Sequence, residues 1–370
     1  MKNKIYFDNL DGWRTVSFLM VFFYHSFYTE NQLIIDSPIY QFITKKLFIN
    51  GNIGVNFFFV LSGFLISYFI ILEKKSSNKI NLPKFWARRV LRIWPLYFFC
   101  VLFGFLLFPL FKSMLGQTSM ETANIIYYLT FTSNFDLINN GLPDASILGV
   151  LWSVSIEEQF YMIWPILLLV VPFKRYNYLF IILILISLWF RSKNPAPISL
   201  EVHSFSCMVD LVVGGFSAWL IIQYPVFLER IRKTKKPLIG LVYLIFLLFI
   251  FYRGYIVGSG FVMMILERMF LASVIAFIIL EQNFSENSFF KMKNNKVLTR
   301  LGKYTYGLYC LHFIGILIAI QSTKLLGLNN QLWQVIFLET AIALTATLIF
   351  AYLSYHILEK PFLKLKNKFN

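Results

Sequence analysis

Long apolar stretches recur along the whole chain, and they restrict what it can fold into more than any other feature. A segment that crosses a bilayer must satisfy its own backbone hydrogen bonds, and runs of this length are typical of transmembrane helices. Charged residues make up only 14% of the 370 residues, against about 25% in soluble domains. We therefore predict an all-α, polytopic membrane helical bundle of about ten transmembrane helices. It should form one membrane domain over residues 1–370, with no fused extracytoplasmic domain.

The apolar segments give approximate boundaries for these helices. The polar N-terminus and the lack of a small-residue cleavage site after the first apolar run indicate a retained span, not a signal peptide. Segment 124–135 is apolar but interrupted, so we expect an outer interfacial helix or a re-entrant piece there. The expected spans are 13–28, 53–72, 93–111, 150–171, 178–192, 205–223, 238–252, 260–280, 305–326 and 332–357.

Lysine and arginine are distributed unequally between the two sides of this bundle. Of the 34 basic residues, 25 fall on the side of the termini, seven fall on the other side, and two, Arg14 and Arg268, lie inside spans. The positive-inside rule then predicts that both termini are cytoplasmic. The formal net charge of +16 reflects topology and contact with anionic lipid, and it is weak evidence for nucleic-acid binding.

The first span carries an arginine near its start and a histidine near its end. On a helix, Arg14 and His25 lie on one face, about 16 Å apart along the axis. Ionisable residues inside a membrane usually face a cavity or a partner. We expect Glu157 of the fourth span at the depth of His25, where it either orients the imidazole of a general base or makes a structural hydrogen bond. Glu158 is a neighbouring candidate, about 100° around the helix.

Three arginines, Arg88, Arg89 and Arg92, stand at the start of the third span. Arg89 and Arg92 share a helix face, and guanidinium groups suit bidentate phosphate binding. Basic residues also flank most cytoplasmic ends of spans. Alone, the cluster therefore favours a topological role over a functional one.

Small and polar residues inside other spans allow two interpretations. Ser62 and Gly63 favour close helix packing, although a thin helix wall would also admit a ligand. His312 either lines a tunnel or is a hydrogen-bonded core histidine. The three cysteines have no CxxC spacing, and His, Glu and Asp do not cluster at metal-ligand spacing, so we predict buried thiols and no catalytic metal.

Two further charges point to structure more than to catalysis. Asp210 and Arg268 both fall in the outer half of their spans, and we expect them to pair across helices. Glu267 and Arg268 are adjacent and therefore point to different faces, so they should not pair with each other.

Six short stretches occur in the order found in the acyltransferase-3 family, which the chain resembles from end to end. Members of that family are integral-membrane enzymes that acylate sugars and other acceptors from acyl-CoA. The family's Arg-x10-His motif is met by Arg14 and His25, and its Arg-x-x-Arg motif by Arg89 and Arg92. The stretches are LDGWRTVSFLMVFFYHS, GVNFFFVLSGFLIS, ARRVLRIWPLYF, LWSVSIEEQFYMIWP, LGKYTYGLYCLHF and ILEKP.

The resemblance implies a multi-pass protein of the bacterial cytoplasmic membrane with a defined reaction. An acyl group, usually acetyl, would pass from cytoplasmic acyl-CoA, a donor substrate and not a resident cofactor, to a hydroxyl of a cell-envelope glycan or lipid-linked sugar. We expect catalysis by His25 with Glu157 or Glu158, either by direct transfer or through an acyl-His or an acyl-Ser62. The residues expected to contact the donor are Arg14, Arg88, Arg89, Arg92, Ser62, Lys303 and His312.

Two alternatives stay open. A transporter or flippase for a lipid-linked sugar would also have ten spans and internal charges, although the inverted repeats common in transporters are not evident. Within the enzyme class, the acceptor could instead be a non-sugar molecule such as a peptide or macrolide.

Overall fold

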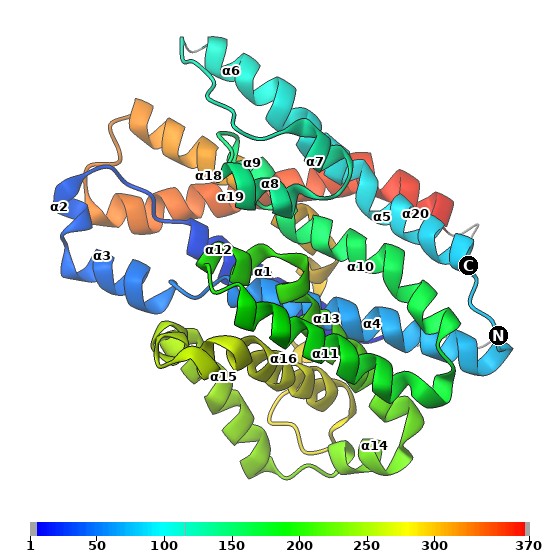
Figure 1. Ribbon diagram of the computed structural model, residues 1–370. Helices are drawn as coiled ribbons and strands as arrows, with labels where there is room; N and C mark the ends of the chain where they lie inside the picture. The colour runs from blue at the N-terminus through cyan, green and yellow to red at the C-terminus, as the bar shows by residue number, and fades with distance from the viewer. Residues whose placement is uncertain (1–5, 115, 367–370) are drawn as a thin grey trace.

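The computed structural model describes residues 6–114 and 116–366, and within these ranges the chain is a helical bundle without a strand (Figure 1). Nine helical segments of the described chain are long and apolar enough to cross a membrane. The prediction of an all-α polytopic bundle is confirmed. These segments are α4 (Ile53–Ser77), α5 to α6 (Leu82–Met114), α9 to α10 (Ser146–Val170), α11 (Tyr176–Lys193 after a 3-10 turn), α12 to α13 (Pro197–Gln223), α15 (Lys236–Gly258), α16 (Phe261–Phe284), α17 to α18 (Lys296–Leu325) and η6 to α20 (Gln334–Leu365).

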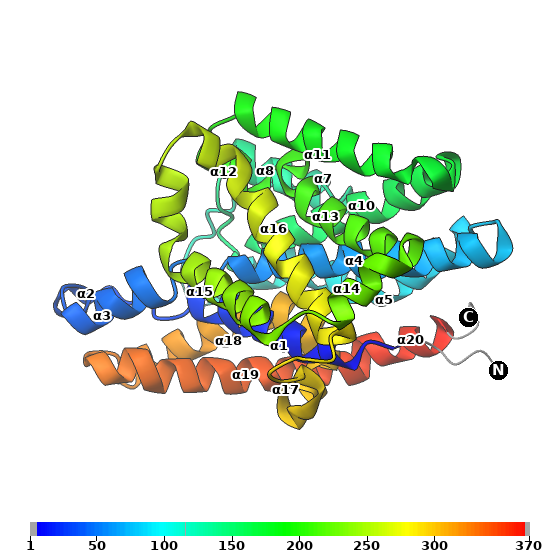
Figure 2. The same cartoon turned by 90° about the horizontal axis from the view of Figure 1, so that it is seen from below.

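Helix α1 (Asp8–His25) is the remaining predicted span. Its 18 residues include Asp8, Asp11 and Arg14, which makes it more polar than the other nine. It lies in the middle of the bundle and contacts α4, α16 and α18 (Figure 2). A central position lets its polar side chains meet protein and not lipid, which is where charged residues inside a membrane are tolerated.

Both ends of the described chain lie at one end of the bundle (Figures 1 and 2). We call that end the terminal face; it carries the start of α1, the end of α4 and the short helix α14 (Pro225–Arg232). The opposite face carries the end of α1 and the short helices α2 (Gln32–Ile35), α3 (Pro38–Phe42) and α12 (Pro197–Val202). That the terminal face is cytoplasmic stays a prediction.

Segment 124–135 does not cross the bundle. It forms α7 (Ile125–Leu129) and the start of α8 (Ser133–Asn140), two short helices separated by a turn. The interruption falls at Phe131, whose φ of 55° is left-handed and ends the first helix. The expectation of an interrupted, non-spanning piece is thus confirmed.

Helix α5 begins well before the predicted span at 93–111, because it starts at Leu82. Its first turns hold Arg88, Arg89 and Arg92, which lower the apolar signal without disfavouring a helix. The span also continues through a π-helical segment, η2 (Phe103–Leu107), into α6 (Phe108–Met114).

The closest helix pair is α4 with α13 (Ser204–Gln223). A Cβ atom on Gly63 would lie 1.9 Å from the Leu211 carbonyl oxygen, and one on Gly214 would lie 2.0 Å from that of Val60. Only glycine permits this approach. The predicted packing role of Gly63 is confirmed, and it turns the neighbouring Ser62 away from α13.

Charged side chains near the opposite face form a network between α11, α12, α13, α15 and α16. Arg268 Nη2 lies 2.8 Å from Asp210 Oδ2, and Glu267 Oε1 lies 2.6 Å from Arg253 Nε. Glu267 also faces Arg191 at 3.6 Å, and Glu201 faces Arg253 at 3.4 Å. The prediction that Asp210 pairs with Arg268 while Glu267 points elsewhere is confirmed.

Candidate active site

Two histidines meet near the opposite end of α1. His25 is its last residue, and its Nδ1 lies 3.2 Å from Nε2 of His312 on α18 (Thr305–Leu325). The ring of Phe313 packs against both imidazoles, with centroid separations of 4.7 and 4.6 Å. His312 is fully buried, whereas His25 is only half-buried. His312 is therefore held within the protein interior, and His25 borders accessible space.

The hydrogen-bond chain behind His25 determines which of its nitrogens can accept a proton. His312 Nδ1 lies 2.6 Å from the Tyr309 carbonyl oxygen, which can only accept, so this nitrogen carries hydrogen. In neutral His312 the other nitrogen is then an acceptor, and His25 Nδ1 must donate to it. This assignment, inferred from the partners, leaves the lone pair of neutral His25 on Nε2, where a general base needs it.

Glu157 of α10 (Leu151–Val170) accepts two hydroxyl hydrogen bonds, one from α4 and one from its own helix. Ser62 Oγ donates to Oε1 at 2.7 Å, and Tyr161 OH donates to Oε2 at 3.0 Å. Tyr161 OH also lies 3.2 Å from Ser62 Oγ. Ser62 and Glu157 are half-buried although they face one another between helices, which indicates that they border an internal space and not a sealed contact.

The expected pairing of His25 with Glu157 is not present, because the two residues lie at different depths. Ser153, one turn from Glu157 on α10, bonds the hydroxyl of Tyr309 at 2.7 Å. The His312 ring lies a further turn toward the opposite face. Glu157 is therefore about two turns, or ~10 Å, nearer the terminal face than the histidine pair. In this structure His312, and not Glu157, orients His25.

Glu158 points toward α5 and not toward the histidines. Trp94 Nε1 donates to its Oε2 at 2.9 Å, while its Oε1 is buried without a hydrogen-bond partner within the described residues. The expected turn of about 100° relative to Glu157 explains this separate direction.

Two of the expected donor-binding arginines come together from distant parts of the chain. Arg14 is held by the carboxylate of Asp11, three residues earlier on α1. Arg92 of α5 is exposed, and it is close enough for its charge to repel that of Arg14. Two guanidinium groups in proximity raise the local positive potential, which favours a polyanion between them.

Arg89 lies three residues before Arg92 on the same helix, between two aromatic rings. Its guanidinium carbon is 5.5 Å from the ring centroids of both Phe85 and Tyr161. Its Nε is buried without a hydrogen-bond acceptor among the described residues. Because Tyr161 also bonds Glu157, the side chain of Arg89 links the arginines to the cluster of Ser62, Glu157 and Tyr161.

The remaining expected donor contacts are dispersed. Arg88 is half-buried on α5. Lys303 lies at the terminal face with its ammonium 4.5 Å from the ring centroid of Tyr304. His312, which was expected to line a donor tunnel, contributes instead to the histidine pair.

Sequence reasoning did not single out Glu359, which lies in the π-helical segment η7 (Tyr355–Glu359). Its side chain is buried, accepts from Ser354 Oγ at 3.4 Å and is close enough to attract Arg92. The residue falls just beyond the predicted last span. Its position in the family-like ILEKP stretch was the available signal. No group of three His, Cys, Asp or Glu side chains suited to a metal ion occurs within 6–114 and 116–366.

The family assignment rests on a comparison that covers nearly the whole chain. The family model described as "Acyltransferase domain" matches residues 7–356, and the chain belongs to this acyltransferase-3 family. No solved structure matches.

Relatives in Staphylococcus aureus have similar sequences. The O-acetyltransferase OatA of strain NCTC 8325 is 25% identical over 395 residues, and the alignment covers 98% of this chain. A protein of strain COL with a provisional O-acetyltransferase name is 26% identical over 385 residues, again with 98% of the chain covered. The chain spans only 58% of the length of each relative.

Proposed function

We propose that the protein is an integral-membrane O-acetyltransferase that moves an acetyl group from cytoplasmic acetyl-CoA to a hydroxyl of a cell-envelope glycan or lipid-linked sugar. The observation that carries the proposal is the arrangement along α1. Arg14, toward the terminal face, is close enough to Arg92 for their charges to repel, and His25 at the other end presents a free Nε2. Family membership and the O-acetyltransferase names of the relatives support acetyl transfer as the reaction.

The donor enters from the terminal face. Arg14 and Arg92 bind the phosphates of coenzyme A, and Arg88 and Lys303 stand apart from them as further basic residues. Guanidinium groups are suited to this role because they remain charged and make paired hydrogen bonds to phosphate. The pantetheine arm then extends between α4 and α10, past Arg89 and the hydroxyl groups of Ser62 and Tyr161.

His25 acts on the acceptor. Its Nε2 takes the proton of the acceptor hydroxyl as the oxygen attacks the thioester carbonyl carbon. His312 accepts a hydrogen bond from Nδ1 of the resulting imidazolium, and the Tyr309 carbonyl oxygen fixes His312 in turn. A base that is oriented by a third group is the usual arrangement for activating a hydroxyl nucleophile.

The products follow from collapse of the tetrahedral intermediate. The carbon–sulfur bond breaks, its electron pair leaves on sulfur, and the proton held by His25 passes to the thiolate. Because Ser62 lies ~10 Å from the histidine pair along the bundle, direct transfer in a ternary complex is favoured over an acyl-Ser62 intermediate. Glu157 holds the Ser62 and Tyr161 hydroxyls in place along the path of the pantetheine arm. Glu158 accepts a hydrogen bond from Trp94 and so holds α5 against α10.

Purified protein in lipid nanodiscs tests the proposal. With radiolabelled acetyl-CoA and a glycan or glycolipid acceptor extract, we expect acetyl ester on the acceptor and stoichiometric free coenzyme A. Initial rates at varied donor and acceptor should follow sequential kinetics. Movement of a lipid-linked sugar between leaflets without any acetyl transfer would support a flippase and reject the proposal.

A further inference from the structure

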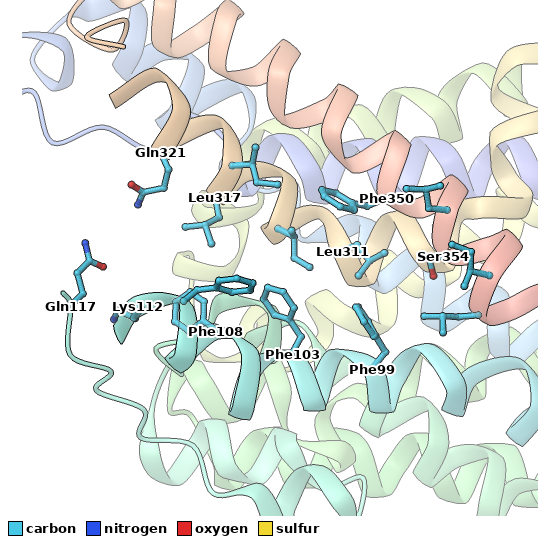
Figure 3. Close-up of a pocket in the computed structure, with 16 residues that line it drawn as sticks. Phe99, Phe103, Phe108, Lys112, Gln117, Leu311, Leu317, Gln321, Phe350 and Ser354 are labelled. Carbon is cyan, nitrogen blue, oxygen red and sulfur yellow. The ribbon is translucent and has the colours of Figure 1, made fainter. Parts of the chain in front are cut away.

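A long groove of about 720 Å³ runs between α5–α6 and the pair α18–α19 (Figure 3). Its wall is almost entirely apolar. Phe99, Phe103 and Phe108 line one side, and Leu311, Leu317 and Phe350 line the other. Both π-helical segments described above, η2 and η7, contribute residues to it. Such segments widen a helix locally and often occur at functional sites.

The groove lies along membrane-spanning helices, with Gln117 from the loop after α6 at one end, and is open on one side. Phe111, Ile318, Leu353 and Ile357 in its lining are exposed, at 52, 39, 43 and 66% respectively. Phe99 and Phe111 mark its length on α5–α6, about 18 Å by helical rise, which is more than half of the ~30 Å hydrocarbon thickness. A groove of this shape suits one hydrocarbon chain lying along the bilayer normal.

Polar residues occur mainly at the end of the groove that faces away from the termini. Lys112 Nζ lies 2.8 Å from both carboxylate oxygens of Asp144. Partial burial would raise the pKa of Asp144, but hydrogen bonds from Lys112 and from the Met120 N–H lower it. The carboxylate of Asp144 is therefore charged, and Lys112 is its ion-pair partner.

Two carboxamides complete this end of the groove, which we call its mouth. Gln117 and Gln321 come from opposite walls, and their side chains point toward one another in Figure 3. Neither side chain makes a hydrogen bond to the rest of the described chain, and both are exposed. An amide offers donors and an acceptor without charge. The mouth therefore suits a head rich in hydroxyl groups better than a phosphate, which requires unpaired cations.

We propose that this groove binds a glycolipid, with one hydrocarbon chain between the phenylalanines of α5–α6 and the aliphatic side chains of α18, and with the sugar at Gln117 and Gln321. The inference deepens the proposed function and rests on it in one respect: the bound glycolipid would be the acceptor. Its head is placed toward the face opposite the arginines, about 13 Å of helical rise beyond His312 on α18. Donor and acceptor then enter from opposite sides.

Photolabelling tests the groove without catalysis. The probe is dodecyl β-glucoside with a diazirine in its chain, applied to the full chain in phosphatidylcholine nanodiscs. Leu317→Trp fills the groove, and Leu247→Trp adds the same volume on α15, where Leu247 is 49% exposed. Gln321→Leu removes one amide of the mouth. If Leu317→Trp does not purify as a single species, Ile318→Trp replaces it.

We expect saturable labelling of peptides from α5–α6 and α18–α19. Labelling should fall at least fivefold in Leu317→Trp, fall several-fold in Gln321→Leu and stay unchanged in Leu247→Trp. Unlabelled dodecyl glucoside should compete, and phosphatidylglycerol should not. Equal labelling of α15, or equal competition by phosphatidylglycerol, would overturn the proposal. Because the assay contains no acetyl-CoA, a protein that fails to transfer acetyl groups can still pass it.

Discussion

Two groups of charged residues lie inside the membrane part of this protein, and they differ in how their charges are balanced. In the network near the opposite face, each guanidinium lies within 3.6 Å of a carboxylate. The charges of Arg191, Arg253 and Arg268 are matched by those of Glu201, Asp210 and Glu267. Such matching is what burial requires of charges that serve structure.

The residues of the proposed donor path are balanced poorly. Arg14 has a carboxylate, but its other charged neighbour is Arg92. Arg89 Nε and Glu158 Oε1 are buried without hydrogen-bond partners in the described chain, but so is Asp210 Oδ1 of the network, so the two regions differ in the pairing of charges and not in hydrogen bonding. Buried polar groups without a hydrogen-bond partner cost free energy. The paired charges are those expected of a network that maintains the fold, whereas the proposed function assigns the less evenly paired charges to binding of the donor.

The largest expected effect is on the transfer rate, and it follows from a change at His25, at the far end of the proposed donor path. His25→Gln keeps hydrogen bonding but cannot accept a proton, so the transfer rate should fall about 10²–10⁴-fold. Acetyl-CoA affinity and the melting temperature should remain near wild type. Transfer assays with isothermal titration calorimetry on one preparation measure all three. A folded variant with normal transfer would make the histidine structural and remove the distinction between the two regions.

The second effect tests the balanced network. Arg268→Met leaves Asp210 charged and unpaired in the interior, which should cost about 3–5 kcal/mol of stability. Thermal unfolding in detergent measures it. The double variant Arg268→Met with Asp210→Leu removes both charges and should recover much of the loss. If the single variant unfolds like wild type but loses activity, the network belongs to the site and our comparison is wrong.

A smaller effect is expected on donor affinity at the arginines near the terminal face. Arg92→Ala removes a charged phosphate contact and should weaken acetyl-CoA binding by about 1.5–3 kcal/mol, or roughly 10- to 150-fold. Arg92→Lys should restore only part of it, since an ammonium lacks the planar fork. Lys84→Ala, in the first turns of the same helix, is the matched control. Unchanged affinity in Arg92→Ala would return the arginines to a purely topological role.

The smallest expected effect is on acetyl-CoA affinity, and it comes from a change at Glu359, next to the proposed donor site. Glu359 attracts Arg92 and so competes with a phosphate for it. Glu359→Gln keeps the shape of the side chain and removes its charge, and acetyl-CoA affinity should rise by about two- to fivefold, as expected for a screened charge interaction. Titration calorimetry at two salt concentrations measures this change. A loss of affinity would show that Glu359 positions Arg92 for the donor.

Much of the fold follows from the sequence because helix length and apolarity are local properties. The spans, the interruption in segment 124–135 and the pairing of Asp210 with Arg268 were all predictable in this way. In the last case two buried opposite charges in the same half of the bundle had few other partners. The close approach at Gly63 was predictable for a similar reason, since small residues permit contacts that other residues prevent.

The axial register between helices was not predictable, and the site depends on it. Hydropathy gave α1 and α4 similar outer ends, yet Gly54 at the start of α4 packs against the backbone of Ser17, well inside α1. Because Ser62 of α4 bonds Glu157, this shift of α4 along α1 also sets the depth of Glu157. The depths of His25 and Glu157 therefore differ although their sequence positions suggested a match. The partner of His25 was equally hidden, because the contact between α1 and α18 joins residues separated by 287 positions.

The glycine contacts between α4 and α13 have a mechanical consequence. With Gly63 and Gly214 each against the backbone of the other helix, this seam cannot slide or rotate without collision. One half of the molecule is thus a rigid frame that fixes Ser62 and, through Asn56 and Asp210, the charged network. Between α5–α6 and α18–α19 the apolar groove takes the place of such a seam, so no comparable backbone contact opposes a relative movement of these helices.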